Sequence, residues 1–99
     1  MEPPATPLGS LPGAEIVVTG IADLEAGRDT VDADAVLMAA TRLRAAGVDV
    51  PSADNDDPAA HRLYAKLSGE DPRNAHSRYN AIVRRVTSFA SAVEHARAG

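Results

Sequence analysis

Two histidines and two tyrosines recur at the same spacing in the second half of the chain. Residues 60–67 read AHRLYAKL and residues 75–82 read AHSRYNAI, so that His61 and Tyr64 correspond to His76 and Tyr79. Imidazole and phenol groups transfer protons in many enzymes, and imidazole is also a common metal ligand. On an ideal helix each histidine falls about 60° from its tyrosine, at the edge of an apolar stripe.

Three interpretations of this repeat are open. A zinc site would need three or four protein ligands with supporting partners, and neither segment carries a second histidine or an acidic residue at ligand spacing. Packing at the border of the core explains the repeat without any chemistry. The third interpretation is that His61 and His76 act as a pH-sensitive pair with the tyrosines. We therefore assign no catalytic, cofactor-binding or metal-binding residue.

The sequence carries no other motif for chemistry. No serine lies in a nucleophile elbow, and there is no phosphate-binding glycine loop or dinucleotide fingerprint. The acidic run of residues 54–57 lacks the glycine and the terminal glutamate of a calcium loop. There is no cysteine for a disulfide or a thiolate metal site. These observations favour a protein that is not an enzyme.

The elements that position these residues are predicted to be helices. The chain has 99 residues, enough for one domain, and 20 of them are alanine. Four helices are predicted in a single domain over residues 14–99, after a disordered, proline-rich arm over residues 1–13. They lie over about residues 14–26, within residues 29–47, and over 58–68 and 72–97. Residues 15–21 include a β-branched run, so a strand remains an alternative there.

The last two helices are predicted to form a tight helical hairpin. Each is preceded by Asp-Pro, at residues 57–58 and 71–72, which suits a capping carboxylate followed by proline in the first turn. Gly69 is predicted to end the third helix. Only three residues then separate the two helices, as in a helical hairpin or a helix-turn-helix.

The last helix is predicted to carry an apolar stripe over about three heptads. Its length of roughly 38 Å exceeds what a compact domain of this size needs, and alanine-rich helices bury little apolar surface of their own. We therefore expect a homodimer in which this stripe contacts a second copy. The predicted interface residues are Tyr79, Ile82, Val86, Phe89 and Val93.

Charge is divided unevenly along the chain, which has a net charge of −4. Residues 1–57 carry eleven acidic residues against three arginines, whereas residues 58–99 carry seven basic residues against three acidic ones. The outer face of the last helix collects polar and basic residues that suit either a partner protein or the major groove of DNA. These residues are Arg73, Ser77, Arg78, Asn80, Arg84 and Arg85.

The preferred functional interpretation is a small helical protein-interaction module, such as an adaptor, a regulatory subunit or an antitoxin-like inhibitor. The alternative is a DNA-binding regulator of the helix-turn-helix type. The first residues lack the pattern of a secretory signal, and no stretch is long and apolar enough for a membrane span. We therefore expect a cytoplasmic protein without membrane contact.

Overall fold

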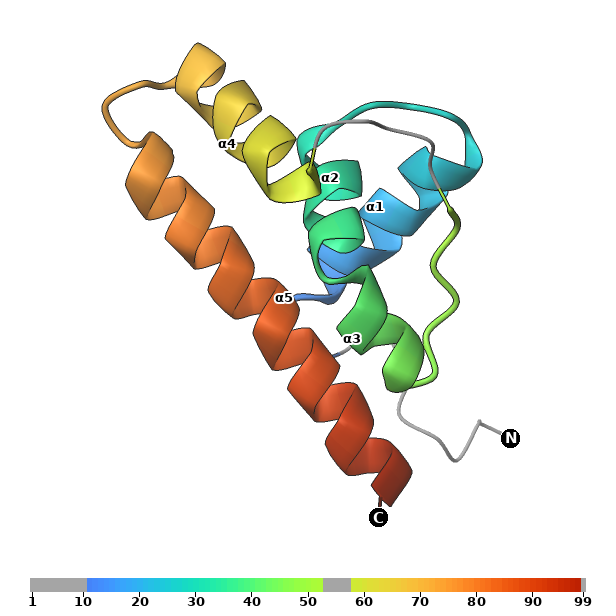
Figure 1. Ribbon diagram of the computed structural model, residues 1–99. Helices are drawn as coiled ribbons and strands as arrows, with labels where there is room; N and C mark the ends of the chain where they lie inside the picture. Colours follow the sequence, from blue (N-terminus) through green and yellow to red (C-terminus); the bar gives the residue numbers. More distant parts are fainter. Residues whose placement is uncertain (1–10, 53–57, 99) are drawn as a thin grey trace.

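The computed structural model describes residues 11–52 and 58–98, and its regular structure in these ranges is entirely helical (Figure 1). The prediction of an all-α protein is thereby confirmed for the described residues, with five helices instead of four. Most of the predicted arm, residues 1–10, and the acidic run of residues 54–57 lie outside the described residues. The helices are α1 (Ala14–Glu25), α2 (Val31–Met38), α3 (Ala40–Ala45), α4 (Ala59–Glu70) and α5 (Ala75–Ala98).

The first helix settles the choice between helix and strand for residues 15–21. Ile16 and Val17 face the core of the protein, whereas Val18 is 50% exposed. The helix is followed by Gly27 in the left-handed conformation, with φ of 76°, which a residue with a Cβ rarely adopts. The left-handed Gly27 therefore marks the end of α1.

The prediction of one continuous second helix is wrong, because the helix is interrupted at Ala39. This residue has φ of −102° and ψ of 12°, and its N–H bonds to the carbonyl of Val36 at 3.2 Å, three residues back. The interruption changes the direction of the chain between α2 and α3 (Figure 1). Val36 before the break and Leu43 after it are both fully buried, so each segment turns its own apolar face inward.

The hairpin between α4 and α5 also differs from the prediction. The fourth helix continues through Gly69 to Glu70, with Asp71 as its C-cap, because Gly69 does not adopt a left-handed conformation. Pro72 lies in the turn before α5 and not in its first helical position. Asn74 closes this turn, since its side-chain amide donates a hydrogen bond to the Asp71 carboxylate at 2.9 Å.

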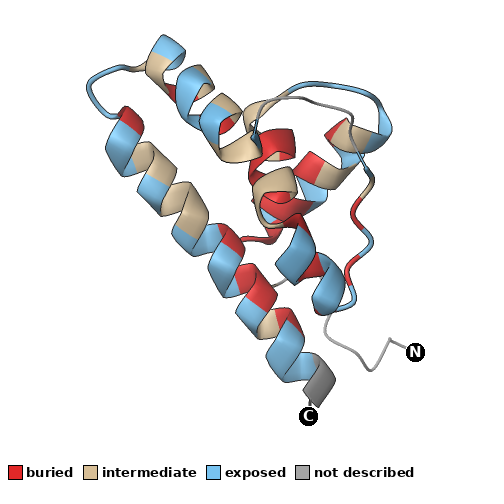
Figure 2. Cartoon of the chain, in the orientation of Figure 1, coloured by how far each residue is buried: buried red, intermediate tan, exposed pale blue. Residues whose placement is uncertain are grey.

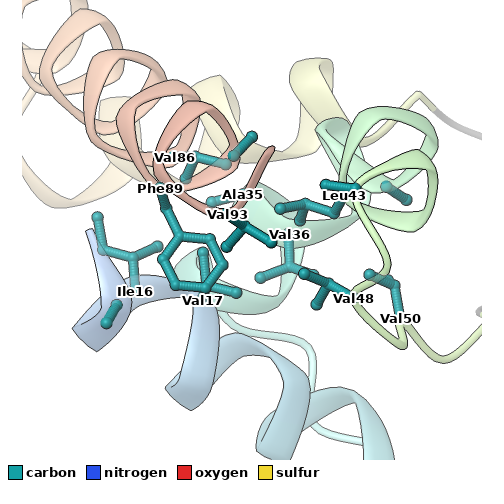
Figure 3. Close-up of a cluster of buried hydrophobic side chains, with 14 of the residues drawn as sticks. Ile16, Val17, Ala35, Val36, Leu43, Val48, Val50, Val86, Phe89 and Val93 are labelled. Carbon is teal, nitrogen blue, oxygen red and sulfur yellow. The ribbon is translucent and has the colours of Figure 1, made fainter. Parts of the chain in front are cut away.

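The core lies where α5 crosses the first two helices. Figure 3 shows Phe89 of α5 inserted beside Ile16 and Val17 of α1, and only 1% of the Phe89 surface is exposed. Val36 of α2 continues the same cluster. The burial pattern in Figure 2 accordingly places buried residues along the central part of α5 and over much of α2. The hydrophobic core therefore depends on contacts among α1, α2 and α5.

Close contact between α1 and α2 requires glycine at position 20. A Cβ added to Gly20 would lie 2.4 Å from the carbonyl oxygen of Asp32 and 2.5 Å from a methyl carbon of Val36. Both distances are far below van der Waals contact, and one involves backbone that cannot move aside. The absence of a side chain at Gly20 thus sets how closely the two helices pack.

We predict that Gly20→Ala destabilises the protein, because the new methyl group must push α1 and α2 apart. The expected loss is roughly 1–3 kcal/mol of unfolding free energy, the usual effect of overpacking. Urea denaturation followed by circular dichroism measures this change.

Gly69→Ala is the matched control. This glycine also lies within a helix, but an added Cβ would have no neighbour within 4 Å. Alanine should therefore stabilise α4 by about 0.5–1 kcal/mol through its higher helix propensity. Equal effects of the two substitutions would contradict the close packing at Gly20.

Candidate interaction site

The two tyrosines of the repeated segments meet where α4 contacts α5. Their ring centroids are 5.6 Å apart, and the rings stand at 61° in an edge-to-face arrangement that suits aromatic quadrupoles. The Tyr79 hydroxyl points to the sulfur of Met38 at 3.5 Å. Tyr64 remains 39% exposed. We call Met38, Tyr64 and Tyr79 the aromatic seam.

The position of α4, and with it Tyr64, is set by a buried carboxylate on α2. Asp34 is 1% exposed, and one of its oxygens accepts hydrogen bonds from the Arg62 guanidinium at 3.1 and 3.2 Å. Its other oxygen accepts a hydrogen bond of 2.5 Å from the ammonium group of Lys66. Lys66 also bonds to Asp29 at 2.9 Å. We call Asp34, Arg62 and Lys66 the buried charge cluster.

The cluster keeps Lys66 charged. Burial acts to lower the pKa of Lys66, but its hydrogen bonds and charge interactions with Asp34 and Asp29 outweigh burial and raise that pKa. The ammonium group therefore stays protonated at neutral pH, and Asp34 has two cationic partners within the fold.

The sequence did not lead us to predict that Asp34 binds Arg62 and Lys66. The residue lies in the first turn of its helix, where an acid is already favourable because of the helix dipole. A signal was nevertheless present. Arg62 and Lys66 are one turn apart and lie beside Leu63 and Leu67, which are the fully buried residues of α4. Two cations bordering a buried stripe indicate an acidic partner on the facing helix.

The two histidines of the repeat do not join a common site. His61 and His76 are both exposed, and a ring nitrogen of His76 lies 3.2 Å from the Asn80 amide nitrogen. In the part of the chain that the structure describes, no group of histidine and acidic side chains is placed to hold a metal ion. The structure therefore brings together the tyrosines of the repeat and leaves its histidines in solvent.

The predicted interface stripe of α5 is divided by the fold. Val86, Phe89 and Val93 are buried against other helices of the same chain, so these side chains present no free surface to a second copy. Tyr79 and Ile82 are only half-buried. The first half of the stripe thus keeps accessible apolar surface, and the second half is core.

The predicted polar face of α5 carries less free positive charge than its sequence indicates. Arg78 pairs with Glu70 at 3.0 Å, and Arg85 pairs with Glu15 of α1. Ser77 and Asn80 are exposed and uncharged. Two further members of this face, Arg73 and Arg84, are also exposed and have no ion-pair partner among the described residues.

Asp23, near the end of α1, and Asp32, in the first turn of α2, have opposite electrostatic surroundings. Asp23 accepts hydrogen bonds from the Thr30 hydroxyl at 2.6 Å and from Arg28 at 2.9 Å, and these partners lower its pKa below the ordinary value of 3.8. Burial raises the pKa of Asp32, and the charge of Asp23 raises it further. Both line a cavity of about 580 Å³ with Lys66 and Glu70.

Comparison of the chain with known protein families, curated proteins and solved structures finds no match. Among the described residues, none of the helices is long and apolar enough to cross a membrane. The candidate site is therefore defined by its own geometry, which consists of the aromatic seam and the buried charge cluster that positions it.

We predict that Asp34→Ala lowers the free energy of unfolding by roughly 1–3 kcal/mol, because it leaves two partly buried cations without their shared partner. Chemical denaturation at neutral pH measures the loss. Glu94→Ala is the control, since it removes an ion pair to Arg42 whose two side chains are about half exposed. A similar loss for both variants would contradict a special role of the buried cluster.

We also predict opposite effects of Asp23→Asn and Asp32→Asn at neutral pH. Because its folded pKa is lowered, Asp23 contributes stability above its unfolded pKa and loses that contribution below about pH 4. Asp32 has a raised folded pKa, so its ionisation opposes folding once the pH exceeds its unfolded pKa. Asp23→Asn should therefore destabilise the protein, and Asp32→Asn should stabilise it.

The free energy of unfolding, measured across the acidic pH range, tests the opposite signs of these two effects. Both differences from the unmodified protein should shrink toward low pH, where the two carboxyls are protonated in the folded and the unfolded chain. Equal effects at neutral pH and at pH of about 2 would show that charge is not the cause.

Proposed function

We propose that this chain is a small, non-enzymatic, cytoplasmic protein-interaction module of the adaptor, regulatory-subunit or inhibitor type. It self-associates through the first half of α5 and the neighbouring face of α4. A partner protein of different sequence then binds to the assembled module.

The aromatic seam is the observation that carries this proposal. Tyrosine and methionine are enriched at protein interfaces relative to other surfaces, and a tyrosine ring presents a large contact area at little cost in conformational entropy. Tyr64 is already fixed by its contact with Tyr79, and Tyr79 is fixed by Met38. The seam is thus preorganised for contact, which reduces the entropy lost on binding.

The composition of the core supports the same proposal. Many of the buried positions are alanine, including Ala33, Ala35 and Ala90, and an alanine side chain contributes little hydrophobic free energy when buried. A chain of 99 residues with such a core has a thin margin of stability. Burial of the seam against a second copy adds stability by mass action.

We predict that Tyr64→Ser shifts the protein from dimer to monomer in light scattering after gel filtration. The side chain is 39% exposed, so its loss should leave the helical circular dichroism spectrum intact. The matched control is Val18→Ser, which removes the other large exposed hydrophobic side chain of the described residues, on α1. That variant should remain a dimer.

Two results would contradict the proposal. An unmodified protein that remains monomeric at all accessible concentrations would exclude self-association. Tight binding of duplex DNA that weakens steeply with salt would instead favour the alternative function predicted from the basic face of α5.

A further inference from the structure

A second surface of α5 and the start of α1 form a shallow hollow of about 580 Å³ that is largely open to solvent, which we call the cavity. The cavity is separate from the aromatic seam, since the two share no residue. Its lining residues are Pro12, Gly13, Glu15, Ala81, Arg84, Arg85 and Ser88. Two arginines predicted for the outer face of the last helix are thus brought together with the N-terminal end of the first.

The residues of α5 give this cavity small side chains between two long ones. Ala81 and Ser88 are seven residues apart and therefore share one line along the helix. On an ideal helix Arg84 and Arg85 lie about 40° and 60° to either side of Ser88. The guanidinium groups of Arg84 and Arg85 consequently flank a shallow strip formed by Ala81 and Ser88. The Ser88 hydroxyl in this strip can donate a hydrogen bond.

The charges lining the cavity do not cancel. Arg85 is paired with Glu15, and both side chains are about half exposed. Arg84 is exposed and has no ion-pair partner among the described residues. The lining therefore carries one net positive charge. The Arg84 guanidinium lies beside the Arg85–Glu15 ion pair, which is itself exposed to solvent.

The position of Glu15 is fixed by Gly13. A Cβ on Gly13 would lie 2.1 Å from the backbone oxygen of Arg85, and the residue has φ of 78°, so only glycine suits this contact. The first turn of α1 is thereby held against α5. Because Glu15 follows two residues later, its carboxylate stays beside Arg85 and occupies the place that an external anion would take.

We propose that this cavity binds a carboxylate side chain from an acidic segment of a partner protein. The inference rests on the proposed function and names the chemistry of the partner. Arginine pairs with carboxylates through parallel hydrogen bonds, and one net positive charge balances one carboxylate. A nucleic acid presents many phosphates and would need several unpaired cations. Glu15 competes with the incoming carboxylate for Arg85 and so limits its affinity.

The test uses the full chain and a fluorescent peptide of alternating glutamate and glycine, with binding followed by fluorescence anisotropy. Arg84→Gln should weaken binding about two- to fivefold, the effect of losing one solvent-exposed charge pair. Glu15→Gln should strengthen binding several-fold, because it removes the internal competitor and leaves Arg85 free. A peptide with glutamine in place of glutamate should not bind.

Arg73→Gln is the matched control, since Arg73 is an exposed arginine before the same helix, outside the cavity. It should leave peptide affinity unchanged. Equal weakening by Arg73→Gln and Arg84→Gln would overturn the inference, because it would indicate diffuse attraction. The absence of peptide binding, a loss of affinity in Glu15→Gln, or stronger binding of duplex DNA than of the peptide would overturn it as well.

Failure of this inference is distinguishable from failure of the proposed function. Tyr64→Ser should change the oligomeric state and leave peptide affinity unaltered, whereas Arg84→Gln should do the reverse. Loss of peptide selectivity with an intact dimer would reject the cavity alone.

Discussion

The arrangement of α4 depends on a carboxylate that has been removed from water. Burial of Asp34 is unfavourable unless cationic partners reach it, and both Arg62 and Lys66 do so from one face of α4. An ion pair of this kind contributes little net stability compared with apolar packing. It does fix orientation, because rotating α4 by one residue, about 100°, would carry both cations away from Asp34. The rotation of α4 then determines where Tyr64 meets α5.

The small residues of the core make this electrostatic constraint more important. Gly20 allows α1 and α2 to pack closely, and alanines fill much of the space between helices, so few large side chains interlock across the interfaces. The fourth helix contributes only Leu63 and Leu67 as fully buried side chains. Two leucines alone would permit sliding and rotation. The buried charge cluster adds a directional contact that excludes these alternatives.

Some local features of the fold were predictable from sequence, although Gly69 does not end α4 and Pro72 lies outside α5. Features that depend on a distant partner were not predictable. Gly27 and Gly47 both adopt positive φ after a helix, at the position where glycine commonly ends helices. The break at Ala39 has no local signal, because alanine is a strong helix former and the packing of Val36 and Leu43 decides the direction of the chain. The burial of Phe89 by its own chain could not be distinguished from burial by a second copy, since both produce the same apolar stripe.

The aromatic seam and the basic cavity lie on two different surfaces of α5, because the core buries only part of the apolar stripe of this helix. The second half of the stripe is buried in the core, and its accessible apolar surface lies in the first half, near the turn with α4. On an ideal helix Ser88 lies about 180° from Tyr79, which places the basic cavity on the side opposite the aromatic seam. A second copy seated on the seam would therefore leave Arg84 open to solvent. The proposed self-association and the proposed binding of an acidic partner would therefore use opposite sides of α5, and each dimer would present the cavity twice.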